Sequence, residues 1–168
     1  MAASTSGEQR IIKLESSEGH RFEVTHKVIS QSRTVRNLLD ALGMDSSNAE
    51  ETIPLLNVPT EILRLVLVWC EKHQNDSPSN AKKEADMSDE EKKWEEEFFR
   101  VEQPILFELV SAANYMDVQS LLDASCKAIA QLIKGKTPEE IRQTFNIKND
   151  LTKEEEEQIS LENAWCFE

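Results

Sequence analysis

The sequence predicts an α+β protein, with a small sheet near the N-terminus and helices from there to the C-terminus. Two observations predict this class. Residues 11–24 hold two short runs in which apolar and polar residues alternate, which is the period of a β-strand. From residue 32 onward, apolar residues recur every three or four positions, which is the period of a helix. The 168 residues suffice for one domain, or for a domain with an appended module.

The N-terminal segment predicts a β-hairpin. Residues 1–9 are small and polar and are expected to form a disordered tail. Ile12 and Leu14 share one face of the first strand, and Phe22 lies on the second. The turn between the two strands contains Gly19, which completes the sequence pattern of a hairpin.

The change of period near residue 32 marks a helix. Ser32 can cap its N-terminus, and Gly43 can end it. Its apolar residues lie at i, i+3, i+4 and i+7: Val35, Leu38, Leu39 and Leu42. Residues 53–55 follow as a short strand, and Pro54 predicts an edge position because proline has no N–H for an inner strand.

The next predicted helix begins at Pro59 and runs to about Lys72. Its central segment, residues 62–70, is apolar nearly all round, so we expect it to be buried. Residues 75–87 are polar and are predicted to be a mobile linker.

Three more helices follow the linker. Ser88 and Glu91 form a capping box at the first, whose aromatic residues have helical spacing and are interpreted as core: Trp94, Phe98 and Phe99. Pro104 opens the second, with an inner side of Ile105, Leu106, Leu109, Val110 and Ala113. Asp117 is expected to cap the third, and Gly135 ends it. The apolar stripe of the third helix comprises Val118, Leu121, Leu122, Cys126, Ile129, Leu132 and Ile133.

The last 32 residues, 137–168, hold two strong helix starts but few apolar residues. Capping boxes begin at Thr137 and Thr152. The large apolar residues are Ile141, Phe145, Ile147, Leu151, Ile159, Leu161, Trp165 and Phe167. Two interpretations stay open: this sparse stripe docks onto the chain's own core, or part of it orders on binding another protein.

The charge of the chain excludes several classes of partner. Its 19 Lys and Arg against 32 Asp and Glu give a net charge of −13, which disfavours nucleic acid and anionic membranes. Residues 150–168 alone carry seven acids and one lysine. No run approaches the ~20 apolar residues of a membrane span. The three cysteines Cys70, Cys126 and Cys166 are odd in number and far apart, as expected of free thiols in the cytoplasm or nucleus.

Sequence patterns of an enzyme are lacking. There is no glycine-rich phosphate loop, no HExxH and no CxxC pair. Cys70 and His73 could form half of a metal site, but the alternative is a buried cysteine and a histidine at a fraying helix end. We therefore expect a non-catalytic protein without a metal or cofactor.

Several motifs make the sequence resemble the S-phase-kinase-associated adaptor family, the adaptor subunits of SCF-type cullin–RING ubiquitin ligases. The motifs are Leu106-Phe107-Glu108-Leu109, Ala112-Ala113-Asn114-Tyr115-Met116-Asp117, Leu121-Leu122-Asp123 and the long run Ile133 to Arg142 continuing through Phe145 to Asp150. Gly43-Met44-Asp45 and Trp69-Cys70 also match. The resemblance covers about residues 10–166.

The resemblance implies a BTB/POZ fold at residues 10–133, followed by a two-helix extension at residues 134–168 that clamps an F-box. It also implies an adaptor that bridges a cullin to F-box substrate receptors for ubiquitin-dependent proteolysis, in the cytoplasm and nucleus. The implied cullin-binding residues are Asn114, Tyr115 and Met44. The implied F-box-binding residues are Leu122, Cys126, Ile129, Ile133, Ile141, Phe145, Ile147 and Trp165.

One alternative function uses the same surface. An apolar stripe without its receptor favours self-association, so the chain could instead act as a homodimer or bind partners other than F-box proteins. Two positions depart from the family pattern: Ser111 is polar where relatives carry aliphatic residues, and Phe167 replaces a more polar end. Pro138 lies in a motif that is hydroxylated in some distant relatives.

Overall fold

The computed structural model describes residues 10–43, 52–78 and 86–166. Contacts between residues divide the chain into two compact units, residues 1–130 and 131–168, and each is described by itself. The predicted tail 1–9, Met44, residues 79–85 of the predicted linker and Phe167 lie outside the described residues. No helix in the described ranges is both long and apolar enough to cross a bilayer.

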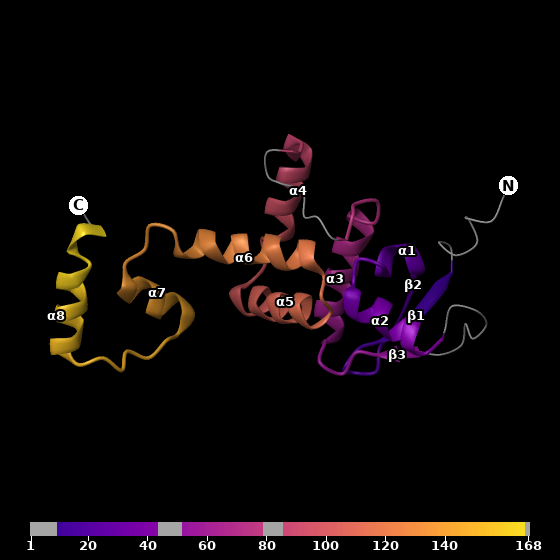
Figure 1. Cartoon of the computed structure of the whole chain (residues 1–168), viewed down its shortest axis with the longest axis horizontal. Coiled ribbons are helices and arrows are strands. Elements are labelled where there is room, and N and C mark those ends of the chain that lie inside the picture. Colours follow the sequence, from indigo (N-terminus) through magenta and orange to yellow (C-terminus); the bar gives the residue numbers. More distant parts are fainter. Residues whose placement is uncertain (1–9, 44–51, 79–85, 167–168) are drawn as a thin grey trace. The chain divides into compact units, whose positions relative to one another are not determined.

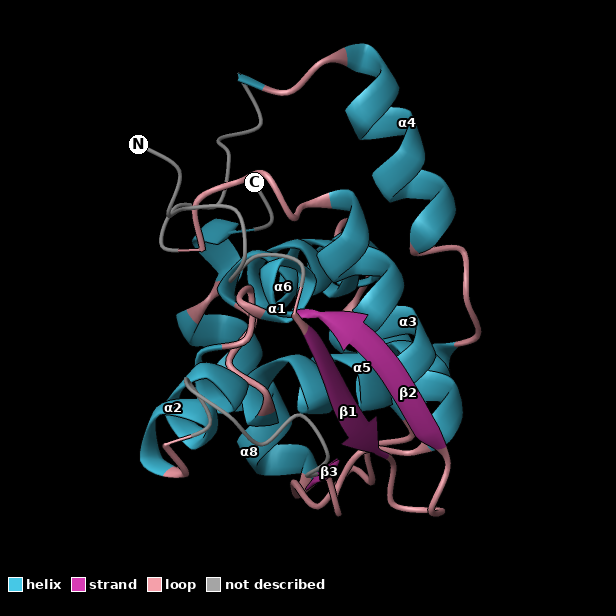
Figure 2. Ribbon diagram, turned by 90° about the vertical axis from the view of Figure 1, so that its right-hand side faces the viewer, coloured by secondary structure: helices cyan, strands magenta, loops and turns pink. Residues whose placement is uncertain are grey.

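The first unit begins with the predicted hairpin. Strands β1 (Ile11–Glu15) and β2 (Arg21–Thr25) are antiparallel, with Leu14 opposite Phe22. Gly19 in the turn has φ +79°, a conformation that glycine adopts without strain. The predicted edge strand is β3 (Thr52–Pro54), which pairs in parallel with β1 and gives the order β2-β1-β3. Figure 2 shows β1 and β2 side by side.

Helices follow the hairpin in the first unit (Figure 1). They are α1 (His26–Ile29), α2 (Arg33–Ala41), α3 (Thr60–Lys72), α4 (Asp89–Phe98), α5 (Gln103–Tyr115) and α6 (Gln119–Ile133). Ser32 caps α2 by accepting a hydrogen bond from the Val35 N–H, as predicted. The capping box of Ser88 and Glu91 at α4 is also confirmed.

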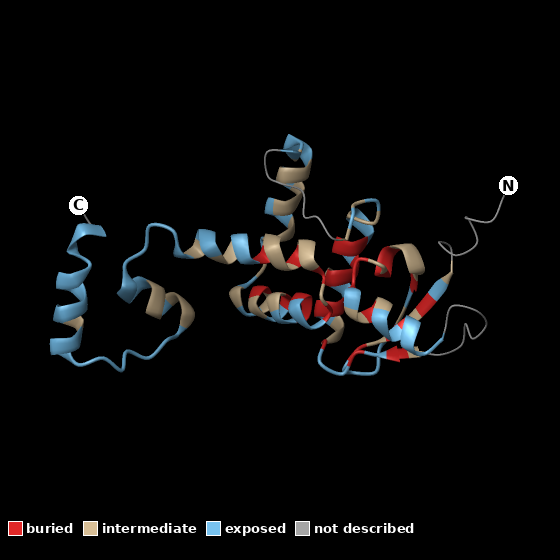
Figure 3. Ribbon diagram, viewed as in Figure 1, coloured by how far each residue is buried: buried red, intermediate tan, exposed pale blue. Residues whose placement is uncertain are grey.

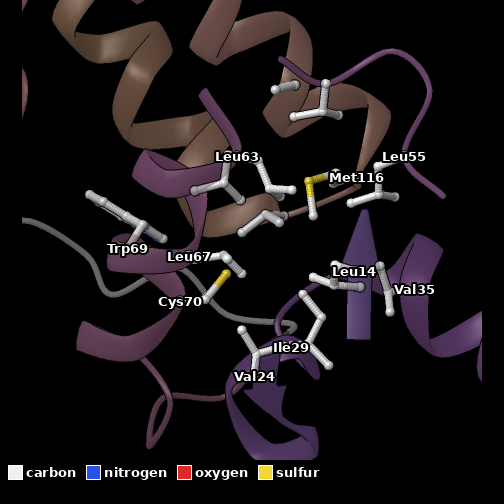
Figure 4. Close-up of a cluster of buried hydrophobic side chains, with 14 of the residues drawn as sticks. Leu14, Val24, Ile29, Val35, Leu55, Leu63, Leu67, Trp69, Cys70 and Met116 are labelled. Carbon is white, nitrogen blue, oxygen red and sulfur yellow. The ribbon is translucent and has the colours of Figure 1, made fainter. Parts of the chain in front are cut away.

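Helix α3 buries most of its apolar residues in the core, while an exposed face carries Glu61, Arg64, Val68 and Glu71. Leu63 and Val66 are fully buried, together with Leu14 of β1 and Leu109 of α5. Figure 4 shows this cluster, including Met116 after α5 and Cys70 of α3. The prediction of a buried helix is confirmed for most of its apolar residues, but Arg64 and Val68, which is 41% exposed, lie on a solvent-facing side.

An aromatic cluster joins α4 to α3. The ring of Trp69, which is 1% exposed, lies 5.8 Å from Trp94 and 5.3 Å from Phe98 between ring centroids. Phe99 is 5.8 Å away, and the Trp69 Nε1–H donates to Ser120 Oγ at 3.0 Å. The α4 aromatics are half-buried and pack against the core, so they cover the end of α3.

The structure corrects the expectation that His73 lies at a fraying helix end. Its ring stacks on Trp69 at 4.3 Å, and its side chain is only 11% exposed. Nδ1 lies 2.8 Å from Asp76 Oδ2, while Gln31 Nε2 donates to the carbonyl of His73 at 2.8 Å. The side chain of Gln31 therefore holds this end of α3 in place.

Two further expectations differ from the structure. Leu38 and Leu42 share the predicted stripe of α2, yet they are 37% and 57% exposed, because only the narrower face with Val35 and Leu39 meets the core. Asp117 does not cap α6. It has φ +50° and ends α5, where the Val118 N–H donates to the Ala113 carbonyl at 3.0 Å in a Schellman arrangement.

The second unit contains the end of α6, helices α7 (Pro138–Phe145) and α8 (Lys153–Glu162), and a short 3₁₀ turn, Ala164–Cys166. Both predicted capping boxes, at Thr137 and Thr152, are confirmed. None of its described residues is buried, as the absence of red from α7 and α8 in Figure 3 shows. Local hydrogen bonds, and not a core, define these helices.

Candidate partner-binding surfaces

The C-terminal end of α5 presents the first candidate surface. Asn114 and Tyr115 are both exposed, with Tyr115 at 38%, while Ala112 and Ala113 of the same turn are buried. The helix therefore buries one side and exposes the two residues that the resemblance implies for cullin binding. Met44, the third residue of that set, lies outside the described residues.

Helix α2 anchors this end of α5. Ser32 Oγ donates to the Met116 carbonyl, and Thr34 Oγ1 donates to the Tyr115 carbonyl at 2.9 Å. The Arg33 guanidinium lies 3.3 Å from the Asp117 carboxylate. These contacts leave the side chains of Asn114 and Tyr115 accessible, because they use the backbone and the residues that follow. Sequence reasoning missed Thr34 and Arg33, whose contacts join segments about 80 residues apart.

The polar residue Ser111 has a local explanation on α5. It is exposed, and its Oγ donates to the Phe107 carbonyl one turn earlier at 3.1 Å. A hydroxyl that bonds its own helix costs little at an exposed position. This departure from the family pattern therefore leaves the packing of α5 intact.

A second candidate surface runs along α6. Leu122, Cys126, Ile129 and Ile133 lie at i, i+4, i+7 and i+11, which places them on one face of the helix. Leu121 and Ser125 are buried against the core. Leu122 is half-buried and packs on that core, whereas Cys126 is exposed and Ile133 is 39% exposed. Ile129 is half-buried, so the α6 stripe alternates between half-buried and exposed residues.

The second unit carries the other residues implied for F-box binding. Ile141 and Phe145 lie one turn apart on α7 and are half-buried. Ile147 is 56% exposed, and Trp165, in the 3₁₀ turn, is 74% exposed. Tryptophan is highly buried on average in folded proteins, so Trp165 is more exposed than is usual for this residue type. Such residues supply large apolar area to a partner.

Polar contacts fix the local path between α7 and α8. The left-handed Asn146, with φ +52°, ends α7, and the Ile147 N–H donates to the Arg142 carbonyl at 2.8 Å. Arg142 lies 3.4 Å from the Glu156 carboxylate, which also accepts a hydrogen bond from Asn149 Nδ2 at 2.6 Å. These contacts order the connector without covering Ile147.

The capping box of α7 makes a testable prediction about Glu140. Hydrogen bonds from the Thr137 backbone N–H and hydroxyl lower the pKa of the Glu140 carboxyl below its ordinary value of 4.5. A lowered pKa stabilises the start of α7 above pH 4.5, and this contribution is lost as the pH falls through the lowered value. An NMR titration of Thr137→Ala should return the pKa of Glu140 toward 4.5. Because the Thr137 backbone N–H stays in place, the return should be partial, and an unchanged pKa would contradict the contribution of the hydroxyl.

The three cysteines differ sharply in their environment. Burial, with a smaller contribution from the Glu71 charge, raises the pKa of the Cys70 thiol to about 12. Cys126 and Cys166 are exposed. Because the thiolate is the reactive form, a thiol reagent at about pH 8 should modify Cys126 and Cys166 in the folded chain and Cys70 only in urea. Mass spectrometry counts the adducts, and three adducts on the folded chain would be the contrary result.

Comparison with known proteins adds sequence similarity to this geometry. A sequence profile for the POZ segment of the Skp1 family matches residues 10–75. This profile is described as the tetramerisation domain of the family. A second profile, described as the Skp1 family dimerisation domain, matches residues 119–166. The chain belongs to the Skp1 family. The first Skp1 profile covers the sheet and α3, and the second covers α6 to the 3₁₀ turn, so the predicted BTB/POZ class with a helical extension is confirmed.

Individual Skp1 relatives match nearly the whole chain. A Caenorhabditis elegans protein named Skp1-related protein is 47% identical over 167 residues, which cover 97% of this chain and 95% of the relative. Two Dictyostelium discoideum proteins, named SCF ubiquitin ligase complex proteins SKP1a and SKP1b, are 46% identical over 158 residues. These matches cover 93% of this chain and 95% of each relative. These matches therefore extend into the segment between the two Skp1 profiles, which contains α5.

Proposed function

We propose that the chain is the adaptor subunit of an SCF-type E3 ubiquitin ligase. It binds a cullin scaffold through Asn114 and Tyr115 and an F-box protein through the α6 stripe and the second unit. Near full-length similarity to proteins named as SCF complex subunits supports this proposal most strongly. The adaptor performs no chemistry itself, and it acts in the cytoplasm and nucleus.

The physical character of the two surfaces supports their separate roles. Asn114 and Tyr115 lie at an end of α5 whose backbone carbonyls accept hydrogen bonds from Ser32 and Thr34. The residues proposed for the F-box include exposed apolar side chains, such as Ile147 and Trp165. An F-box is a short helical motif, and an amphipathic helix binds by placing its apolar side against apolar side chains of this kind.

Co-purification tests the adaptor proposal directly. The full chain, an F-box protein and a cullin N-terminal domain are mixed and separated by size-exclusion chromatography. With both partners present, we expect one peak that contains all three proteins. When one partner is left out, we expect the chain to form a binary complex with the other. Capture of neither partner would contradict the proposal.

A homodimer is the second candidate, and one observation favours it. The family profile that matches residues 119–166 is described as a dimerisation domain, and the α6 stripe lies within those residues. Light scattering of the free chain at tens of micromolar tests this candidate, with a mass that rises with concentration as the expected result. A strict monomer would contradict it. If the dimer uses the α6 stripe, an added F-box protein should dissociate it.

A further inference from the structure

A cavity of about 280 Å³ opens on the polar side of α2. Its lining residues are His26, Arg33, Arg36, Asn37 and Asp40, and we call it the arginine pocket. The four α2 residues lie at i, i+3, i+4 and i+7, so they share one helical face. His26 is the first residue of α1. The arginine pocket belongs to the first unit and uses neither Asn114 nor Tyr115.

Arg36 leaves a hydrogen-bond donor unused at this pocket. Its Nε is buried and has no partner among the residues that the structure describes. A guanidinium stays protonated in proteins, so the N–H cannot be removed by titration. An enclosed donor without an acceptor is costly, whereas an oxygen that reached Nε and a terminal nitrogen together would satisfy it. Arg36 itself lines the pocket, and its side chain is half-exposed.

The charge around the pocket selects the kind of oxygen ligand. Arg33 and Arg36 each carry a positive charge and Asp40 a negative one, so the lining has a net charge of +1 with His26 neutral. Asp117, 3.3 Å from Arg33, offsets that charge. With Asp117 counted, the two arginines and two aspartates sum to zero, so a group with one negative charge adds less unbalanced charge than a phosphate dianion. Arginine also binds carboxylates in a bidentate geometry.

We propose that the arginine pocket binds a side-chain carboxylate, from an aspartate or glutamate of a protein partner. Arg36 holds the carboxylate through two parallel N–H donors, Nε and one terminal nitrogen, and the Asn37 amide offers a further N–H. The pocket, at about 280 Å³, has ample room for a side-chain carboxylate. The chain has a net charge of −13, so this pocket provides a specific attachment for an acidic segment that the rest of the surface repels.

NMR titration of the full-length chain tests the proposal. The probe is aspartate blocked at both ends, compared with acetate and with inorganic phosphate at about pH 7.5 and constant ionic strength. We expect saturable shifts of the Arg36 Nε–H and Asn37 amide signals with blocked aspartate, at lower concentration than with acetate. Arg36→Met should abolish saturation. Arg36→Lys keeps the positive charge but cannot bind a carboxylate through two parallel N–H donors, so it should weaken binding by about 5-fold or more.

Arg64→Met is the matched control, because Arg64 is exposed on α3 and does not line the pocket. It should leave the titration unchanged, and a thermal melt confirms that each variant folds. Shifts that stay linear, or that Arg64→Met reduces as much as Arg36→Met, would overturn the proposal. Tighter binding of phosphate would overturn the carboxylate assignment, and equal binding of acetate would overturn the protein source. If Arg36→Met fails to fold, the affinity of the Arg36→Lys variant for blocked aspartate is the deciding measurement, and an affinity equal to that of the unchanged chain would overturn the proposal.

Discussion

A chain carrying Asn114→Lys and Tyr115→Ala should bind a cullin N-terminal domain about 1,000-fold more weakly than the unchanged chain. Loss of a central aromatic side chain and insertion of a charge at an interface each cost about 2 kcal/mol or more. Both side chains are exposed, while the carbonyl of Tyr115 that Thr34 binds is unaffected by the substitution. Isothermal titration calorimetry with the cullin domain measures the loss.

The same double variant should keep its F-box affinity within about twofold, since the α6 stripe and α7 share no residue with the altered positions. Ser111→Ala is a matched control, because Ser111 is an exposed residue of α5 whose hydroxyl bonds its own helix. It should change neither affinity. Parallel loss of cullin and F-box binding in the double variant, with a lowered melting temperature, would point to unfolding and contradict a separate cullin surface.

Trp69→Ala should lower the free energy of unfolding by about 3–5 kcal/mol, the usual cost of removing a buried aromatic side chain. Trp69 is 1% exposed, and its ring contacts His73 and the α4 aromatics at centroid distances between 4.3 Å and 5.8 Å. Its removal also leaves the Ser120 hydroxyl without the indole donor. Urea unfolding followed by circular dichroism measures the change.

Trp165 provides a control of the same residue type. At 74% exposed, it should tolerate Trp165→Ala with a change in stability within about 0.5 kcal/mol, as is usual for surface substitutions. Its F-box affinity should nevertheless fall by about tenfold or more, because aromatic side chains dominate protein interfaces. Equal stability losses in the two variants would mean that Trp165 is part of a core, which would contradict its proposed role.

Local rules made the helix ends predictable. Ser32, Ser88, Thr137 and Thr152 each cap the helix expected from the sequence, because an N-cap hydrogen bond needs only residues three positions apart. Asp117 shows the limit of such rules. Aspartate suits both an N-cap and the left-handed end of a helix, and the structure places it in the second role.

Long-range features were less predictable. Helical period predicts that Leu38 and Leu42 share a face with Leu39, but the width of the buried strip depends on what packs against it. The parallel pairing of β1 with β3 joins residues about 40 positions apart, and nothing in either strand specifies it. The candidate cullin-binding and F-box-binding residues came from family resemblance and not from periodicity or spacing. The assignment of a cullin or an F-box protein to each surface rests on that resemblance.

The capping boxes of α7 and α8 have a kinetic consequence. Each fixes the first turn of its helix from residues within that turn, although neither helix has a buried residue. The slow step of helix formation is the first turn, and here the sequence itself promotes it. An arriving partner therefore meets segments that already have helical shape, so its association rate depends on diffusion and orientation more than on folding. Substituting Thr137 or Thr152 would then slow capture, while escape from the finished complex would change less.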